Sequence, residues 1–220
     1  MAIAFRSESH DIANGASGPV DPGEPAGAAQ NDILVSLFMV TASSSYSLPA
    51  GWTSLYSGTS ATSQYKYNLA YIVRGGSAPS TSWTYSGLPY HEVYIVAFSG
   101  CDTVHPINAQ AQIASFQGVN TNPDPPSVTT TGFPAMILAI GTNWNGSASS
   151  WTAPSGYILQ TDNSAHNDCT ISTKTLSLPG SEDPGAYSGV STGGSADIWA
   201  ATIALNPASL SSVSSAWMYG

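Results

Sequence analysis

Histidines beside carboxylates are the first residues of this sequence that could do acid–base chemistry. Each of the four histidines lies within three residues of an Asp or Glu: His10, His91, His105 and His166. Neighbouring residues on a strand point to opposite faces, so His91 and Glu92 do not form a catalytic pair. In "CDTVHP" we expect Asp102 to cap the backbone of a turn. We therefore expect no catalytic histidine.

Glu92 and Asp197 are a second candidate, because glycoside hydrolysis uses two carboxyl groups across a cleft. The two acids lie 105 residues apart, each just before the apolar part of a predicted strand. This position predicts exposed acids at strand starts, and we expect no active site there.

The segment "TDNSAHNDC", residues 161–169, is rich in the oxygen ligands that calcium prefers. It lacks the spacing of an EF-hand, and the segment at the corresponding earlier position, "SGTSATSQY", has no charge. We expect a solvated hairpin tip, with calcium as the alternative. No cofactor is predicted.

Aromatic residues near turns are the remaining candidates for binding. The chain has 6 Trp and 11 Tyr, and four of these residues lie in or beside predicted turns: Tyr46, Tyr90, Trp144 and Trp151. Exposed rings could stack on sugars or pack against another subunit. The sequence leaves both alternatives open.

Other motifs and the charge pattern exclude several classes of protein. The sequence has no G-x-S-x-G elbow, P-loop, dinucleotide fingerprint or H-E-x-x-H. Four basic residues in a chain of net charge -9 cannot form a phosphate-binding stripe, so we expect no nucleic-acid partner. No apolar run has the length of a membrane helix, and the N-terminus lacks the apolar core of a signal peptide. Cys101 and Cys169 are interpreted as reduced thiols.

An internal repeat organises the strands that would position these residues. An offset of 105 residues aligns "SSYSLPAGW" (44–52) with "SSWTAPSGY" (149–157) and continues to Phe98 and Ile203. Both copies show apolar or alternating runs of strand length, such as "NDILVSLFMV" and "AMILAIG", separated by Gly- and Pro-rich turns. The Pro-x-Gly-aromatic motif predicts a turn followed by a core aromatic. The sequence therefore predicts an all-β, jelly-roll-like two-sheet sandwich built from two repeats.

The predicted domain organisation is a single domain over residues 1–207 followed by a tail. Repeat one covers about 1–107 and repeat two about 108–207, with no flexible linker between them. The tail, 208–220, ends in Trp217, Met218 and Tyr219, three large apolar residues after a serine-rich stem. We expect these three to dock on a partner protein, with a disordered terminus as the alternative.

The segments "PGEPAGAAQNDILVSLFMV", "LPAGWTSLYSG", "YIVRGGSAPSTSWTYSG" and "VYIVAFSGCDTVHPI", with "ALNP" at 204–207, resemble phage and prophage virion β-sandwich proteins. The resemblance covers about residues 20–207 and brings no catalytic residues. It implies a non-enzymatic virion protein, a head decoration or tail component assembled in the host cytoplasm. Its expected partners are capsid or tail subunits and further copies of itself. The alternative is a carbohydrate-binding receptor module of a tail fibre or spike that contacts a host surface glycan.

Overall fold

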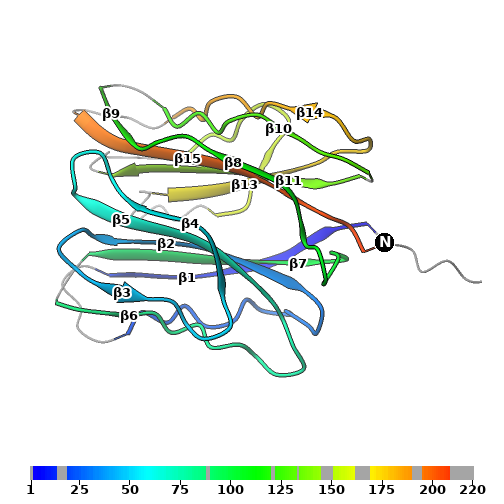
Figure 1. Cartoon of the computed structure of the whole chain (residues 1–220), viewed down its shortest axis with the longest axis horizontal. Helices are drawn as coiled ribbons and strands as arrows, with labels where there is room; N and C mark the ends of the chain where they lie inside the picture. Colours follow the sequence, from blue (N-terminus) through cyan, green and yellow to red (C-terminus); the bar gives the residue numbers. More distant parts are fainter. Residues whose placement is uncertain are drawn as a thin grey trace, which may run out of the picture.

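The computed structural model describes residues 2–13, 19–87, 90–119, 122–132, 134–144, 151–161, 169–189 and 195–208. These residues form strands and connecting turns, and no helix occurs among them. The predicted all-β two-sheet sandwich is confirmed (Figure 1).

The first sheet comes from the N-terminal half of the chain. Its antiparallel strands follow the order β1-β7-β2-β5-β4. Their bounds are β1 (Ala4–Ala13), β2 (Ile33–Thr41), β4 (Thr53–Thr59), β5 (Tyr65–Val73) and β7 (His91–Ser99). A small sheet lies beside it, made of β3 (Tyr46–Ser47) and β6 (Thr84–Tyr85).

The second sheet comes from the C-terminal half, with the order β12-β13-β11-β15-β8 and with β9 also paired to β15. Its strands are β8 (Ile107–Gln112), β9 (Phe116–Val119), β11 (Met136–Trp144), β12 (Ile158–Leu159), β13 (Cys169–Thr175) and β15 (Ser195–Leu205). Two further strands form a separate pair, β10 (Val128–Thr129) and β14 (Ser181–Glu182). The two sheets have equivalent strand orders, β1-β7-β2-β5-β4 and, read from the other edge, β8-β15-β11-β13-β12. The repeat as a sequence relationship stays a prediction.

The inner faces of the two sheets share one core. Alternate residues of β7, among them Tyr94 and Phe98, join alternate residues of β15, among them Trp199 and Ile203. Tyr67 of β5 stacks on Trp199 across the interface, with ring centroids 4.4 Å apart. Each half therefore depends on the other to keep its inner face out of water.

The outer faces of both sheets are also covered, by loops of the same half. Trp83 bridges to Val20 and stacks on Phe38 over the first sheet. Tyr187 lies over the second sheet, where its hydroxyl donates to the Ala139 carbonyl at 2.6 Å. Burial on both faces explains why the central strands read as continuous apolar runs instead of alternating patterns.

Candidate functional site

A hollow of about 510 Å³ lies at one end of the sandwich. Three parts of the chain meet there: the first strand β1, the connection between the two halves (residues 100–106) and the end of the last strand β15. It is lined by Arg6, Gln30, Asn31, Asp32, Ser99, Gly100, Cys101, Asp102, Thr103, Val104 and Ala208. We call this place the junction pocket. It brings together basic, acidic and thiol side chains, which are the types of group that could bind a ligand or take part in a reaction.

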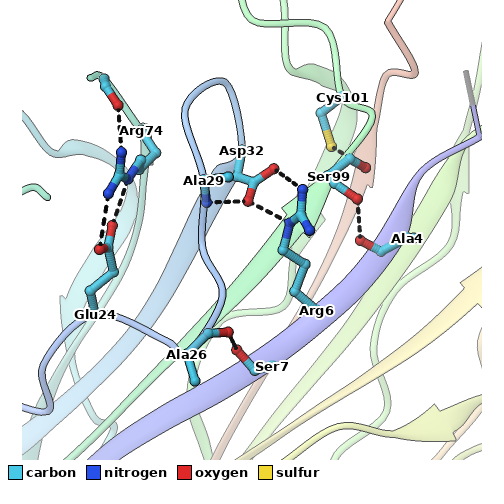
Figure 2. Close-up of polar contacts among 11 residues, drawn as sticks. Ala4, Arg6, Ser7, Glu24, Ala26, Ala29, Asp32, Arg74, Ser99 and Cys101 are labelled. Atoms are coloured by element: carbon cyan, nitrogen blue, oxygen red, sulfur yellow. Dashed lines mark hydrogen bonds and ion pairs between the residues drawn. The ribbon is translucent and has the colours of Figure 1, made fainter. Parts of the chain in front are cut away.

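Arg6 and Asp32 form an ion pair in the junction pocket (Figure 2). The Arg6 Nε lies 2.6 Å from Asp32 Oδ2, and its Nη2 donates to Oδ1 at 3.2 Å. Arg6 falls at an irregularity in the pairing of β1 with β7, between Phe5 and Ser7. Asp32 is almost fully buried and also accepts the Ala29 N–H at 2.7 Å. Because both carboxylate oxygens are bonded within the fold, this pair fixes the loop before β2.

A second arginine holds the same loop from the other side. Arg74 Nε lies 2.9 Å from Glu24 Oε1, and its Nη2 donates to Oε2 at 3.3 Å (Figure 2). The Arg74 backbone N–H donates to the Asp32 carbonyl, and its carbonyl accepts from Asn31. Asn31 has a φ of 74°, a conformation that asparagine tolerates better than most residues. Sequence reasoning missed both pairs. The available signal was that Asp32 directly precedes a buried strand in a chain with only four basic residues.

Cys101 supplies the thiol of the junction pocket but not an activated nucleophile. Burial, with a smaller contribution from the charge of Asp32, raises the pKa of this thiol to about 12. The thiolate is the reactive form of cysteine, so Cys101 is protonated and inert at neutral pH. Both Cys101 and Cys169 are buried free thiols.

Asp102 and Asn206 tie the connection between the halves to the last strand. Asp102 Oδ1 accepts the N–H groups of Val104 and His105 at 2.8 and 3.0 Å, which lower the pKa of this carboxyl. The predicted cap of the "CDTVHP" turn is thus confirmed. Asn206 donates to the His105 carbonyl and accepts from Asn108 through its side chain.

The Pro-x-Gly-aromatic motif forms the predicted turn in both halves. The Trp52 N–H donates to the Pro49 carbonyl at 3.4 Å, and the Tyr157 N–H donates to that of Pro154 at 3.0 Å. The glycines at positions 51 and 156 have φ values of 88° and 81°, which side-chain-bearing residues rarely adopt. Trp52 is buried over the first sheet, and its indole N–H donates to the Ser80 carbonyl at 2.8 Å. The motif is a turn and core device.

Glu92 and Asp197 differ from the prediction. Both side chains are buried, at 0% and 2% exposure, so the prediction of exposed acids at strand starts is wrong. Glu92 lies on the inner face of β7 and accepts from the Tyr90 hydroxyl at 3.2 Å. Asp197 Oδ2 accepts both the N–H and the hydroxyl of Thr62, in the turn between β4 and β5. The donor to Glu92 lies two residues before it in the chain, whereas the donors to Asp197 come from the other half of the chain.

His91 faces away from Glu92, as strand alternation predicts. It is buried on the outer face of the first sheet, with Nε2 3.7 Å from Asp11 Oδ1 and its ring 5.3 Å from that of Tyr85. Burial lowers the pKa of His91, against the opposing effect of Asp11. His10 lies 3.2 Å from Glu8 at the edge of the same sheet. No two histidines share a site in the described residues.

Of the four aromatic candidates, Tyr90 and Trp144 pack against each other, whereas Tyr46 and Trp151 pack on the outer faces of the first and second sheets. Trp144 is 8% exposed in the shared core, where Tyr90 packs edge-on against it with centroids 5.0 Å apart. Trp151 is 4% exposed against Tyr187 on the outer face of the second sheet. Tyr46 is half-buried and contacts Phe38. The two buried indoles therefore have no free face for a sugar, and whether any of these residues contacts a ligand stays a prediction.

The remaining candidates lie outside the described residues. They are His166, most of the oxygen-rich segment, and Trp217, Met218 and Tyr219 of the tail. Across the described ranges, no group of three or more His, Cys, Asp or Glu is arranged to hold a metal ion. No helix in the described part of the chain could cross a membrane.

Comparison with protein-family models, with curated proteins and with solved structures finds no match to this chain. The chain is an all-β sandwich in which Arg6 pairs with Asp32 in the junction pocket and Arg74 pairs with Glu24 beside it.

Proposed function

We propose that this chain is a non-enzymatic structural protein of a phage particle, displayed on its head or tail. The observation that carries the proposal is the structural use of the residues on which the resemblance to virion sandwich proteins rests. Asp32 bonds to the loop before β2, and Trp52 packs in the core on the outer face of the first sheet. Asn206 links the end of the last strand to the connection between the halves by its hydrogen bond to the His105 carbonyl. The residues on which the resemblance rests are therefore also residues that build the fold.

The chemistry of the junction pocket supports this assignment over hydrolysis. General acid–base or nucleophilic catalysis needs a group whose pKa suits the working pH. Here Asp32 is bonded to Arg6 and Ala29, and the raised pKa keeps the Cys101 thiol protonated. These groups position the chain and leave no activated acid, base or nucleophile in the pocket.

Immunogold electron microscopy on purified particles of the phage that encodes the chain tests the proposal. We expect label on every particle, at one repeated location on the head or tail. Absence of the chain from purified particles, with abundant chain in the infected lysate, contradicts the proposal. A glycan array with the purified chain tests the alternative of a receptor module. Strong binding to one glycan class would replace the structural assignment with that alternative.

The predicted docking role of the tail is tested on the same particles. We expect deletion of the tail, residues 208–220, to lower occupancy on the particle while leaving the melting temperature of the purified chain nearly unchanged. Wild-type occupancy of the truncated chain contradicts docking by Trp217, Met218 and Tyr219.

A further inference from the structure

One flank of the sandwich is built from segments that contain no charged residue. It consists of β4, at the edge of the first sheet, with β8 and β9 of the second sheet. The Ala61 N–H after β4 donates to Ser115 Oγ before β9 at 3.2 Å, which joins the two edges. Residues 42–65 and 106–119 contain no Asp, Glu, Lys, Arg or His. We call this surface the uncharged flank.

Charged residues are few in this chain, 4 basic and 13 acidic in 220 residues, and the segments of this flank hold none of them. At the opposite edge of the first sheet, β1 carries Arg6, Glu8, His10 and Asp11. Charged residues on an edge strand discourage pairing with another chain. The β1 edge therefore has a protection that the β4 edge lacks.

The backbone of β4 offers hydrogen-bonding groups along its outer edge. β4 pairs only with β5, and no other described segment bonds to its backbone. The edge of β8 is different, because Asn108 exchanges hydrogen bonds with the backbone of Thr131. β12 has only two residues. Among the described sheet edges, β4 is thus the long one that is neither charged nor covered.

A β-bulge limits the part of β4 whose outer edge is regular enough to pair with another strand. The register with β5 shifts between Ser54 and Tyr56, so a regular edge runs only from Tyr56 to Thr59. Ser57 and Thr59 are exposed. Phe116, one of few large apolar residues exposed in the described structure, lies on the same flank at 37% exposure.

We propose that the uncharged flank is the interface between two copies of this chain, with β4 pairing antiparallel to β4 of the second copy about a twofold at Ser57, so that the two Ser57 residues lie opposite each other. A twofold contact uses the same surface on both partners, and an antiparallel strand pair satisfies this requirement. Two chains of charge -9 repel each other over most of their surface, whereas this flank brings no carboxylate against another. This proposal rests on the proposed structural role in a phage particle, and it names a second copy of the chain as one partner in that role.

Sedimentation of the purified full chain tests the interface. We expect a dimer for the wild type. Ser57→Glu places two carboxylates near each other across the twofold, and like charges across an interface cost several kcal/mol, so dissociation should be easier by at least about 30-fold. Ser177→Glu is the matched control, because Ser177 is also exposed but lies between β13 and β14, away from the flank. This control should remain dimeric.

A charge-swap experiment separates a broken interface from a damaged fold. Ser57→Glu and Ser57→Lys should each be monomeric when alone, and their mixture should form a heterodimer. A monomeric wild type, or a Ser57→Glu variant that dimerises as tightly as the control, overturns the interface. Failure of the proposed function is a separate result, because a dimer that is absent from phage particles leaves this interface standing.

Discussion

Gly58 of β4 should resist replacement by alanine, because the Tyr67 ring lies directly over it. A Cβ at position 58 would be 2.6 Å from the Tyr67 hydroxyl and 2.7 Å from its Cζ, closer than real Cβ contacts. Tyr67 cannot swing freely, since it is 6% exposed and stacks on Trp199 of the second sheet. Gly58→Ala therefore forces a shift in the contact that joins the two sheets.

Two opposing effects set the size of this perturbation. Overpacking a well-packed core costs about 1–3 kcal/mol. Alanine in a strand regains about 0.5–1 kcal/mol relative to glycine, because it loses less backbone entropy on folding. We expect a net loss of about 1–2 kcal/mol, which lowers Tm by about 2–8 °C for a chain of this size.

Urea unfolding and thermal melts of four variants measure the effect. Gly76→Ala is the control, because its Cβ would meet no atom within 4 Å. Tyr67→Leu removes the ring, so Gly58→Ala should cost clearly less in that background. Equal costs of Gly58→Ala in both backgrounds, or a Gly58→Ala variant as stable as wild type, would refute the steric reasoning.

Three further predictions follow from the core and the thiols. Trp52→Ala should lower the free energy of unfolding by about 3–5 kcal/mol without changing assembly; unchanged melting with lost partner binding would show that Trp52 is a contact instead. Cys101 should be unreactive toward a thiol reagent in the native chain at pH 8. Its raised pKa of about 12 keeps the thiolate population small until the pH approaches that value. Rapid labelling of Cys101 in the native chain, mapped by mass spectrometry, would contradict its burial. Residues 1–107 expressed alone should aggregate, because the inner face of the first sheet would lose its cover; a soluble fragment with its own cooperative melt would show two independent domains.

Local patterns in the sequence predict the strands and turns well, because those features depend on neighbours in the chain. The apolar run before Thr41 predicts that β2 is buried on both faces. The glycines of the two Pro-x-Gly-aromatic motifs predict turns with positive φ. The fold class follows from repeating these patterns along the chain.

Burial of polar and aromatic residues was harder to predict, because it depends on segments distant in sequence. Asp197 lies near the start of its strand like an exposed acid, yet Thr62, which is 135 residues away in the sequence, bonds to it and covers it. Trp144 adjoins a predicted turn but is the last residue of β11, where it packs in the shared core. The Arg6–Asp32 pair joins positions 26 residues apart, and no local pattern pairs them.

The contacts between the halves favour the prediction that the sandwich is one folding unit. At one end, Thr62 of the first half bonds Asp197 of the second. In the middle, Tyr67 stacks on Trp199. At the other end, the Cys101 backbone forms a β-bridge with Pro207, just after the last strand. The Asn206 side chain donates a hydrogen bond to the His105 carbonyl in the connection between the halves. Because these contacts extend along the full length of the sandwich, separating the sheets anywhere exposes apolar surface and unpaired polar groups together. The cost of that exposure makes partial opening unfavourable, and it favours a single cooperative transition over sequential melting of the two halves.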